Sequence, residues 1–463
     1  MKTATESDTT IGLTAGEDQE LTLSPQDYSL LTDLYQLTMA ACYVGEGLER
    51  QQASFELFAR RFPENFGYLI AMGLAQALDY LEKFSFSPAQ IEALQSTGIF
   101  ANAPERFWEL LATARFTGDV WAVPEGTAVF ANEPLLRVDA PLWQAQLVET
   151  YLLNAINYQT LIATRSARLR DVAGPQAQLL EFGTRRAFGP QASIWAARAA
   201  LAAGLDATSN VLAALKLGRK PAGTMAHALV MAIAAGEGSE EGAFAAFHRY
   251  FPGAPLLIDT YDTIAAARQL AERVNRGEMR LEGVRLDSGN LVELSREVRS
   301  LLPGVPIFAS GDLDEWKIFE LKNLGACIDG YGLGTKLVSG EPVNGVYKLV
   351  EINGIPVMKE ASGKATYPGR KQIFRYLQNG QVRGDCLGLV TDVVNQSSVP
   401  LMELMVKDGE RVRPVESLDA IAQRTAASVA SLPAETRRLD NPISPVVEIS
   451  PELEILTQRT KKR

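Results

Sequence analysis

Apolar residues in the first quarter of the chain recur mostly three or four positions apart, the spacing of amphipathic helices. This spacing predicts mainly helical structure over residues 25–112, starting at Ser24-Pro25, a pair typical of a helix start. Residues 115–138 differ, because short β-type runs alternate there with Pro-Glu-Gly and Asn-Glu-Pro turns. The helical spacing returns over residues 140–173 and predicts a long helical segment.

After about residue 177 the pattern changes to short apolar runs, each followed by a polar or glycine-containing corner and a helical stretch. The runs are AQLLEFGTRR (177–186), PAGTMAH (221–227), APLLIDTYDT (254–263), EGVRLDSGN (282–290), VPIFASGD (305–312) and ACIDGYGLGT (326–335). Strands alternating with helices predict an α/β fold with a parallel sheet, either open or closed into a barrel. Arginines, aspartates, hydroxyl residues and His227 stand at the carboxyl ends of these runs. This favours a βα barrel, because the active site of a barrel lies at the face where the carboxyl ends of its strands converge.

Past residue 340 the chain returns to β-type segments, including residues 345–361 with an Asn-Gly hairpin turn. We expect these segments to join residues 115–138 in a second, discontinuous α+β domain built from both ends of the chain. The predicted organisation is a flexible tail over 1–24, an α+β domain over 25–150 joined by about 341–440, the barrel over 151–340, and a C-terminal tail over 441–463.

Composition narrows the class of protein. The formal net charge of −10 argues against a surface for duplex nucleic acid or anionic membranes, although a local basic cluster could still bind a small anion. The cysteines Cys42, Cys327 and Cys386 lack metal-ligand spacing, which favours a reducing cytoplasm over a disulfide framework. No run approaches the ~20 apolar residues that a membrane-spanning helix needs.

Several corners could bind anions or carry out chemistry. The backbone amides of GYGLGT (330–335) could cradle a phosphate, or the segment could be a plain turn. It is not a dinucleotide fingerprint, because Thr335 stands where the third glycine would be. Arg185 follows a predicted strand and suits phosphate or carboxylate recognition. Arg285 and Asp287 share one face of a strand, either as a salt bridge or as part of a polyphosphate site.

His227 is one of two histidines, and it stands in an otherwise apolar run. A lone histidine in such a run is commonly a core residue. A barrel would instead place His227 at the rim, among the acids, arginines and hydroxyls of the other corners. The other histidine, His248, is predicted to be structural.

The segments TDLYQLTM, EFGTRRA, GTMAHA, LIDTYDT, GVRLDSGN, ASGDLDE and YGLGTKLV together resemble nicotinate phosphoribosyltransferase, in the order of that family. The resemblance covers about residues 25–440. It implies a β-rich domain packed on an irregular βα barrel, and a homodimer with shared active sites. It also implies a reaction of nicotinate with 5-phosphoribosyl 1-pyrophosphate that forms nicotinate mononucleotide and pyrophosphate, with Mg²⁺ present and with ATP as co-substrate.

The same resemblance implies roles for individual residues. Phe182 and Tyr35 would sandwich the pyridine ring, with Tyr35 supplied by the partner subunit. Arg285 would lie near the ring or its carboxylate, Arg185 would bind a phosphate, and Asp287 would hold the ribose diol. The remaining expected substrate-binding residues, most of them around the 5′-phosphate, are Ser310, Gly311, Gly332, Gly334 and Thr335.

His227 matches the histidine that this family phosphorylates from ATP. We expect Asp259 to orient its ring, as a carboxylate orients a catalytic histidine. Ala228 departs from the serine that many members carry after this histidine, so Thr208 or Ser209 could take over binding of the carboxylate. The alternatives are a nicotinamide phosphoribosyltransferase, a quinolinate enzyme, and a non-catalytic nucleotide-binding relative.

Overall fold

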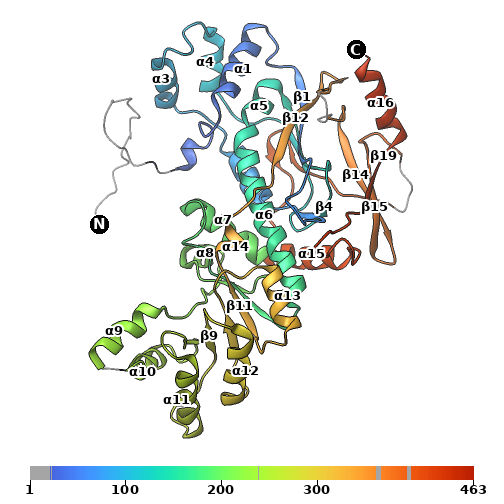
Figure 1. The fold of residues 1–463 in the computed structure, drawn as a ribbon. Helices are drawn as coiled ribbons and strands as arrows, with labels where there is room; N and C mark the ends of the chain where they lie inside the picture. The colour runs from blue at the N-terminus through green and yellow to red at the C-terminus, as the bar shows by residue number, and fades with distance from the viewer. Residues whose placement is uncertain (1–20, 22, 238, 361–365, 394–397, 463) are drawn as a thin grey trace.

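The computed structural model describes residues 21, 23–237, 239–360, 366–393 and 398–462. The predicted flexible tail, residues 1–24, lies outside this part of the chain except for residues 21, 23 and 24. The structure is mixed α/β with a parallel sheet, as the sequence predicted (Figure 1).

The helices are η1 (Pro25–Asp27), α1 (Leu34–Gly45), α2 (Leu74–Glu82), α3 (Pro88–Ser96), α4 (Glu105–Ala112), α5 (Leu142–Leu147), α6 (Glu149–Ala173), α7 (Pro190–Ala202), α8 (Val211–Lys216), α9 (His227–Glu237), α10 (Glu241–Tyr250), α11 (Thr263–Asn275), α12 (Leu291–Leu301), α13 (Glu315–Asn323), α14 (Thr335–Val338), α15 (Leu418–Ala430) and α16 (Pro451–Lys461). The strands are β1 (Gln52–Ala59), β2 (Leu69–Ile70), β3 (Asp119–Ala122), β4 (Ala128–Val129), β5 (Pro134–Pro141), β6 (Gln178–Glu181), β7 (Ala207–Thr208), β8 (Leu256–Leu257), β9 (Val284–Leu286), β10 (Ile307–Ala309), β11 (Gly330–Leu333), β12 (Gly345–Ile352), β13 (Ile355–Pro356), β14 (Lys371–Gln378), β15 (Gln381–Leu389), β16 (Ser398–Pro400), β17 (Glu403–Lys407), β18 (Glu410–Arg411) and β19 (Val446–Ile449).

An antiparallel sheet joins distant parts of the chain in the upper half of Figure 1. Its strand order among the described residues is β13-β12-β1-β5-β3-β17-β18, so β12 and β17 from the later part of the chain flank early strands. β1 lies inside the stretch predicted to be mainly helical. All its residues but the first are buried, so the alternation of buried and exposed positions that marks a strand is absent.

Two predictions for the C-terminal part of the chain, a hairpin and a tail, can be compared with the structure. The hairpin predicted at Asn353-Gly354 is confirmed, because both residues have positive φ and Ile352 pairs with Ile355. The predicted C-terminal tail is wrong: β19 pairs with β15, and α16 packs against the sheet with Leu453 fully buried. Ser450-Pro451 starts α16 with the same signal that starts η1.

The parallel sheet lies in the lower half of Figure 1, and its described strands have the order β7-β6-β11-β10-β9-β8. The first strand of the unit, β6, pairs with the last, β11. The order is therefore that of a ring that is open between β7 and β8. The carboxyl ends of all these strands lie at one edge, because the strands run parallel.

The opening between β7 and β8 is occupied by an extended segment, residues 221–226. The Ala222 N–H donates to the Thr208 carbonyl at 2.9 Å, and the Thr224 hydroxyl donates to the Pro255 carbonyl, next to β8. The apolar run PAGTMAH, expected to follow the strand pattern, is thus extended but forms no strand. Pro221 lacks the N–H that a ladder needs.

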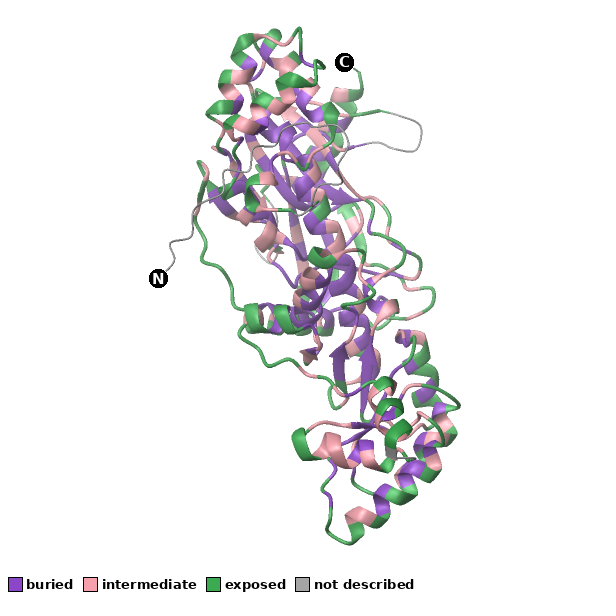
Figure 2. Ribbon diagram, turned by 90° about the vertical axis from the view of Figure 1, so that its left-hand side faces the viewer, coloured by how far each residue is buried: buried purple, intermediate pink, exposed green. Residues whose placement is uncertain are grey.

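Two hydrophobic clusters form the core of the described residues, one under each half of the molecule. α6 contributes to both clusters, through Leu152 and Ile156 in one and Ile162 and Leu169 in the other. Figure 2 shows the buried residues as a band through the middle of the ribbon, with exposed residues on the outer helices. None of the helices described here is long and apolar enough to cross a membrane.

A buried cluster of charges joins the turn before β5 to the sheet of β14 and β15. Arg375 binds Asp385 through Nε at 3.0 Å and Nη2 at 2.6 Å, and all three residues of the cluster, including Glu133, are at least 96% buried. Burial and the neighbouring Asp385 carboxylate raise the pKa of Glu133 well above its usual value. Glu133 therefore favours its protonated form.

A Glu133→Gln variant should become more stable relative to the native chain as the pH rises. A raised carboxyl pKa stabilises the fold below about pH 4.5, and this contribution is lost as the pH rises toward the raised value. The glutamine carries no titrating proton, so the difference in unfolding free energy should grow by up to about 1.4 kcal/mol per pH unit. Denaturant unfolding from pH 5 to 8 measures it, with the exposed Glu410→Gln as control. Parallel pH profiles would contradict the interpretation.

Candidate active site

The carboxyl edge of the parallel sheet brings together most of the residues selected from the sequence. Asp287 follows β9, and Ser310 follows the neighbouring β10. The Ser310 hydroxyl donates to Oδ1 of Asp287, and Ser310 itself is buried. This bond leaves the other Asp287 oxygen available to accept hydrogen bonds from a ligand.

Asp259, after β8, braces the loop that carries Asp287. Its Oδ2 accepts from the Asp287 N–H and from the Ser288 hydroxyl, both at 2.8 Å. Its Oδ1 is buried and has no hydrogen-bond partner among the described residues. A buried, unsatisfied carboxylate oxygen is costly unless a ligand or water binds it. Asp259 therefore combines a structural role with a free acceptor at the site.

His227 is the first residue of α9, beside the opening of the sheet. Its Nδ1 lies 3.0 Å from the Thr260 hydroxyl. The expected partner, Asp259, is instead bound to the backbone of Asp287 and to Ser288, as described above. The orienting group seen here is thus the residue after the predicted one, because Asp259 points along the sheet edge while Thr260 reaches toward α9. Nε2 of His227 forms no hydrogen bond with the described residues and is therefore free.

A cavity of about 420 Å³ lies inside the parallel sheet and contains Phe182 and Arg285 in its wall. Gly332 of β11 makes room for the aromatic ring: a Cβ added there would lie 2.6 Å from Cδ2 of Phe182. From the sequence, Gly332 was expected to form part of the 5′-phosphate cradle. The structure places Gly332 against the ring of Phe182.

Arg285 faces the same cavity. Nη2 donates to the Met225 carbonyl at 3.3 Å, while Nε is buried without a partner among the described residues. Burial lowers the pKa of the guanidinium, and the Asp287 and Asp259 carboxylates oppose this shift. Arg185 is exposed after β6, and its charge also acts on Arg285. The cavity therefore offers an aromatic face and an unsatisfied cationic donor.

The glycine-rich corner follows β11. Gly334 precedes the four-residue helix α14, which begins at Thr335. Gly311 approaches the Asp287 loop closely: its φ is +95°, and an added Cβ would lie 2.3 Å from the Asp287 carbonyl. Only glycine allows this approach. Gly311, Gly334 and Thr335 therefore line the same edge as Asp287 and Ser310.

Tyr35 lies apart from this group. It is the second residue of α1, in the upper half of Figure 1, and 47% of it is exposed. Together with Asn154 and Tyr158 of α6 it lines a separate hollow of about 390 Å³. Within one chain the structure therefore does not bring Tyr35 to Phe182.

Glu181, the last residue of β6, was not predicted from the sequence as a functional residue. This buried carboxylate accepts from the Gly183 N–H and from the Thr208 hydroxyl, and burial raises its pKa. It thus ties the FGTRR corner to β7. Thr208 had been expected as a possible carboxylate ligand, but its hydroxyl is already bound to Glu181. The signal was present, since an acid in an apolar run is rarely buried without a partner.

Comparisons with known proteins match this chain along most of its length. The model for the nicotinate phosphoribosyltransferase (NAPRTase) N-terminal domain matches residues 30–157, that for the NAPRTase family matches residues 177–306, and that for the C-terminal domain matches residues 390–457. The chain belongs to the nicotinate phosphoribosyltransferase family. The resemblance predicted from the motifs is confirmed, and the chain is an enzyme of this family.

Individual nicotinate phosphoribosyltransferases agree with this assignment. The chain is 41% identical over 427 residues to nicotinate phosphoribosyltransferase pncB2 of Mycobacterium tuberculosis, covering 89% of each chain. It is 42% identical over 391 residues to the Bacillus subtilis enzyme, covering 79% of this chain and 77% of that one. The crystal structure of human nicotinic acid phosphoribosyltransferase superimposes with a TM-score of 0.80 at 31% identity, covering 93% and 99% of the two chains.

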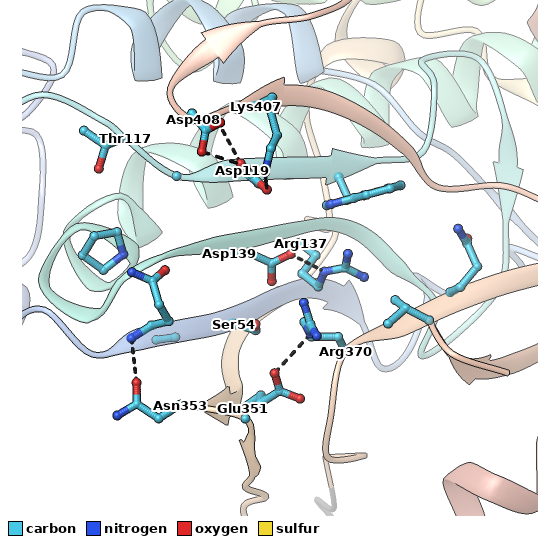
Figure 3. A pocket seen from close by; sticks show the side chains of 18 of the residues that line it. Ser54, Thr117, Asp119, Arg137, Asp139, Glu351, Asn353, Arg370, Lys407 and Asp408 are labelled. Atoms are coloured by element: carbon cyan, nitrogen blue, oxygen red, sulfur yellow. Dashed lines mark hydrogen bonds and ion pairs between the residues drawn. The ribbon is translucent and has the colours of Figure 1, made fainter.

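A larger hollow, of about 1180 Å³, lies away from the carboxyl edge of the parallel sheet (Figure 3). Its charged residues are mostly paired within the protein: Asp139 with Arg137 at 3.0 Å, and Glu351 with Arg370 at 3.1 Å. Nζ of Lys407 lies 2.7 Å from Oδ2 of Asp119 on the paired strand β3 (Figure 3). These pairs neutralise most of the charge in the hollow, although Oδ1 of Asp139 has no hydrogen-bond partner among the described residues.

The residues at the carboxyl edge of the parallel sheet fit a metal ion only in part. Among the described residues no group of three or more His, Cys, Asp or Glu side chains could hold a metal ion. Mg²⁺ commonly binds proteins through one or two carboxylates, with substrate phosphates and water completing its shell. Asp259, with its unpartnered oxygen, and Asp287 suit that limited role.

Proposed function

We propose that this enzyme joins nicotinate to 5-phosphoribosyl 1-pyrophosphate, releasing pyrophosphate, and that ATP drives the reaction through phosphorylation of His227. The relatives named above are nicotinate phosphoribosyltransferases. The observation that carries the substrate assignment is the shared cavity of Phe182 and Arg285, where an aromatic face adjoins a buried, unpartnered guanidinium nitrogen.

Nicotinate is a flat ring with a carboxylate, and both groups find a counterpart in this cavity. The ring would stack on Phe182. The carboxylate would accept from Nε of Arg285, which supports recognition of an acid in the absence of a serine at position 228. Nicotinamide lacks that negative charge and would leave the guanidinium poorly neutralised. The assignment therefore favours nicotinate over the amide.

The ribosyl donor would bind along the carboxyl edge of the sheet. The free oxygen of Asp287 would hold the ribose diol, and Arg185 would bind a phosphate. The amides around Gly311 and Gly334, with the Thr335 hydroxyl, would hold the 5′-phosphate. Mg²⁺ would be held by pyrophosphate oxygens and by Asp259 or Asp287, and would neutralise the leaving group.

His227 would accept the terminal phosphoryl group of ATP. The bond between Nδ1 and Thr260 leaves Nε2 as the nucleophile; its attack on phosphorus forms the P–N bond and releases ADP. Water later cleaves that bond and releases phosphate. The position at the start of α9 supports this role, because a helix N-terminus stabilises added negative charge.

We also propose a homodimer in which each chain supplies Tyr35 to the site of its partner. The ring of Tyr35 is half exposed on α1, and Leu31 and Leu34 beside it are also exposed. On the other face, Phe188 and α8 expose apolar side chains close to the carboxyl edge of the sheet. Exposed apolar surface at both places fits a contact between copies.

The parallel unit would act as an irregular βα barrel, with the remaining strands as a second domain built from both ends of the chain. The pairing of β6 with β11 and the bridging of the opening by residues 221–226 support the barrel. The pairing of β12 with β1 supports the second domain. The absence of a disulfide pattern supports a cytoplasmic location.

A Tyr35→Ala variant should raise the KM for nicotinate about tenfold or more, with a much smaller change for the ribosyl donor. The variant loses the stacking face on one side of the ring while Asp287 and the phosphate-binding amides remain. Steady-state kinetics with each substrate varied in turn measures the effect. An unchanged KM for nicotinate would remove Tyr35 from the pocket.

Mixing two impaired chains, assayed at a nicotinate concentration well below the native KM, tests whether the sites are shared. A dimer of one Tyr35→Ala chain and one Asp287→Asn chain contains one site with both residues intact. Random reassortment should restore about a quarter of the native activity, because half of the dimers are mixed. Mixing that restores no activity, although subunit exchange is demonstrated, would place both residues of a site in one chain.

A further inference from the structure

α6 is a 25-residue helix that runs through the middle of the molecule and packs on both halves (Figure 1). Its position is fixed by buried polar contacts. Thr164 accepts from the Ile70 N–H at 2.9 Å, and Arg168 binds Glu315 of α13 at 2.9 Å. Arg168 is at least 98% buried, so this ion pair is well shielded from water. These contacts make α6 a fixed reference for elements attached to it.

The first residue of α6, Glu149, lies beside Tyr35. Glu149 is 7% exposed, and its Oε2 accepts from Nε2 of Gln146 at 2.9 Å. Gln36, the residue after Tyr35, donates from Nε2 to the same oxygen at 3.5 Å, and the Tyr35 hydroxyl lies near enough to this carboxylate to interact with it. Burial and the charge of Glu149 raise the pKa of Tyr35 to about 12, so the hydroxyl keeps its proton at neutral pH. The hydroxyl end of Tyr35 is therefore held by α6, while its ring remains exposed.

The middle of α6 holds a second element, the short helix α14. A helix of four residues has too few internal hydrogen bonds to be stable alone, and its last carbonyl groups have no partner within it. The Tyr158 hydroxyl donates to the Val338 carbonyl at 3.0 Å. Arg165 donates to the Leu337 carbonyl at 3.3 Å and to the Ser339 carbonyl. Side chains of α6 thus cap the helix that starts at Thr335.

We propose that α6 positions parts of both substrate sites: Glu149 holds Tyr35 for the nicotinate ring, and Tyr158 with Arg165 holds α14 for the 5′-phosphate of the ribosyl donor. The proposal rests on the proposed function for the roles of Tyr35 and Thr335. Glu149 and Arg165 are sixteen residues apart, or about 24 Å along the helix. In the proposed dimer, one α6 would therefore serve the nicotinate pocket of the partner and the phosphate cradle of its own chain.

Substitutions at the two ends of α6 should change the KM values of different substrates. Tyr35→Phe and Glu149→Ala should each raise the KM for nicotinate about fivefold, because the ring is no longer held by its hydroxyl. The double variant should be no worse than either single variant, since both remove the same interaction between the hydroxyl and the carboxylate. Glu149→Gln should restore most of the loss, because its amide oxygen still accepts from Tyr35. The KM for the ribosyl donor should change less than twofold in all four.

Tyr158→Phe is the matched variant nine positions further along the helix. It should raise the KM for the ribosyl donor about fivefold and leave the KM for nicotinate within twofold. The full-length chain is used throughout, and thermal unfolding is measured beside the kinetics. A general loss of stability would raise both KM values together, whereas positioning separates them. If Glu149→Ala does not fold, Tyr35→Phe carries the test of the first half.

Three results would overturn the proposal. Effects of Tyr35→Phe and Glu149→Ala that multiply in the double variant would show that they act independently. A Tyr158→Phe variant with an unchanged KM for the ribosyl donor would remove the second half. Normal nicotinate KM values for Tyr35→Phe and Glu149→Ala would remove the first half. If Tyr35→Ala also has a normal value, the proposed role of Tyr35 fails; if it has a raised value, only the positioning by Glu149 fails.

Discussion

Replacing His227 with alanine is expected to uncouple mononucleotide formation from ATP while the protein remains folded. His227 is partly exposed at the start of α9, and its one hydrogen bond to the described residues is that with Thr260, so its loss should disturb little of the structure. ATP-dependent release of ADP should fall at least 100-fold, because alanine offers no nucleophile. Transfer driven by the ribosyl donor alone should persist at the rate seen without ATP.

The control for His227→Ala is His248→Ala, which removes the other histidine, in the last turn of α10. It should keep native coupling. Thr260→Val should lie between the two, because the ring remains but loses the group that orients Nδ1. Product formation and ADP release are followed together in each variant. A His227→Ala enzyme that still releases ADP in step with mononucleotide would contradict the role given to this residue.

The second large effect is a fall in kcat/KM for the ribosyl donor in the Asp287→Asn variant. The native carboxylate accepts from Ser310 through Oδ1 and has its other oxygen free for the ribose diol. Asparagine keeps the shape but replaces one acceptor with a donor, which faces either Ser310 or the ribose hydroxyls unfavourably. We expect kcat/KM for the ribosyl donor to fall on the order of 100-fold or more, as when a charged group at a transition state is lost.

Glu293→Gln is the matched control for Asp287→Asn, since it neutralises an exposed acid on the helix that follows the same loop. It should leave kcat/KM within twofold of the native value. Binding of nicotinate to the Asp287→Asn enzyme should also be retained, because Phe182 and Arg285 are untouched. A fall of less than threefold in kcat/KM for the ribosyl donor would exclude Asp287 as its main ribose ligand.

The parallel part of the fold could be predicted because its signal is local. Each buried strand is a short apolar run, and the residue after it must leave the sheet, as Asp287 and Ser310 do after β9 and β10. Parallel strands place those residues at one edge without any knowledge of their contacts. The grouping of the anion-binding corners followed from this geometry alone.

Other features depend on contacts that no local pattern contains. β1 is buried on both faces between β12 and β5, so its sequence lacks the alternation of a half-exposed strand. The choice of Thr260 over Asp259 for His227 depends on how the corner after β8 turns toward α9. The separation of Tyr35 from the cavity depends on how the two halves of the chain pack together. Only an assembly of two chains could bring Tyr35 to the cavity.

The assignment of individual roles drew on the family resemblance more than on physical pattern. An exposed arginine such as Arg185 has many ordinary explanations, and its position after β6 does not select one. By contrast, Nε of Arg285 and Oδ1 of Asp259 are buried without a hydrogen-bond partner among the described residues, and both side chains lie beside the Asp287 loop. That these two atoms lack a partner can be recognised only when the burial and the hydrogen bonds of each side chain are known.

The most direct test of the proposed function is a product assay by mass spectrometry. The native protein receives Mg²⁺, 5-phosphoribosyl 1-pyrophosphate and an equal mixture of nicotinate, nicotinamide and quinolinate, with and without ATP. The proposed function predicts nicotinate mononucleotide as the main product, in an amount that rises with ATP and is accompanied by ADP. Nicotinamide mononucleotide as the main product, or a yield of nicotinate mononucleotide that does not respond to ATP, would contradict it.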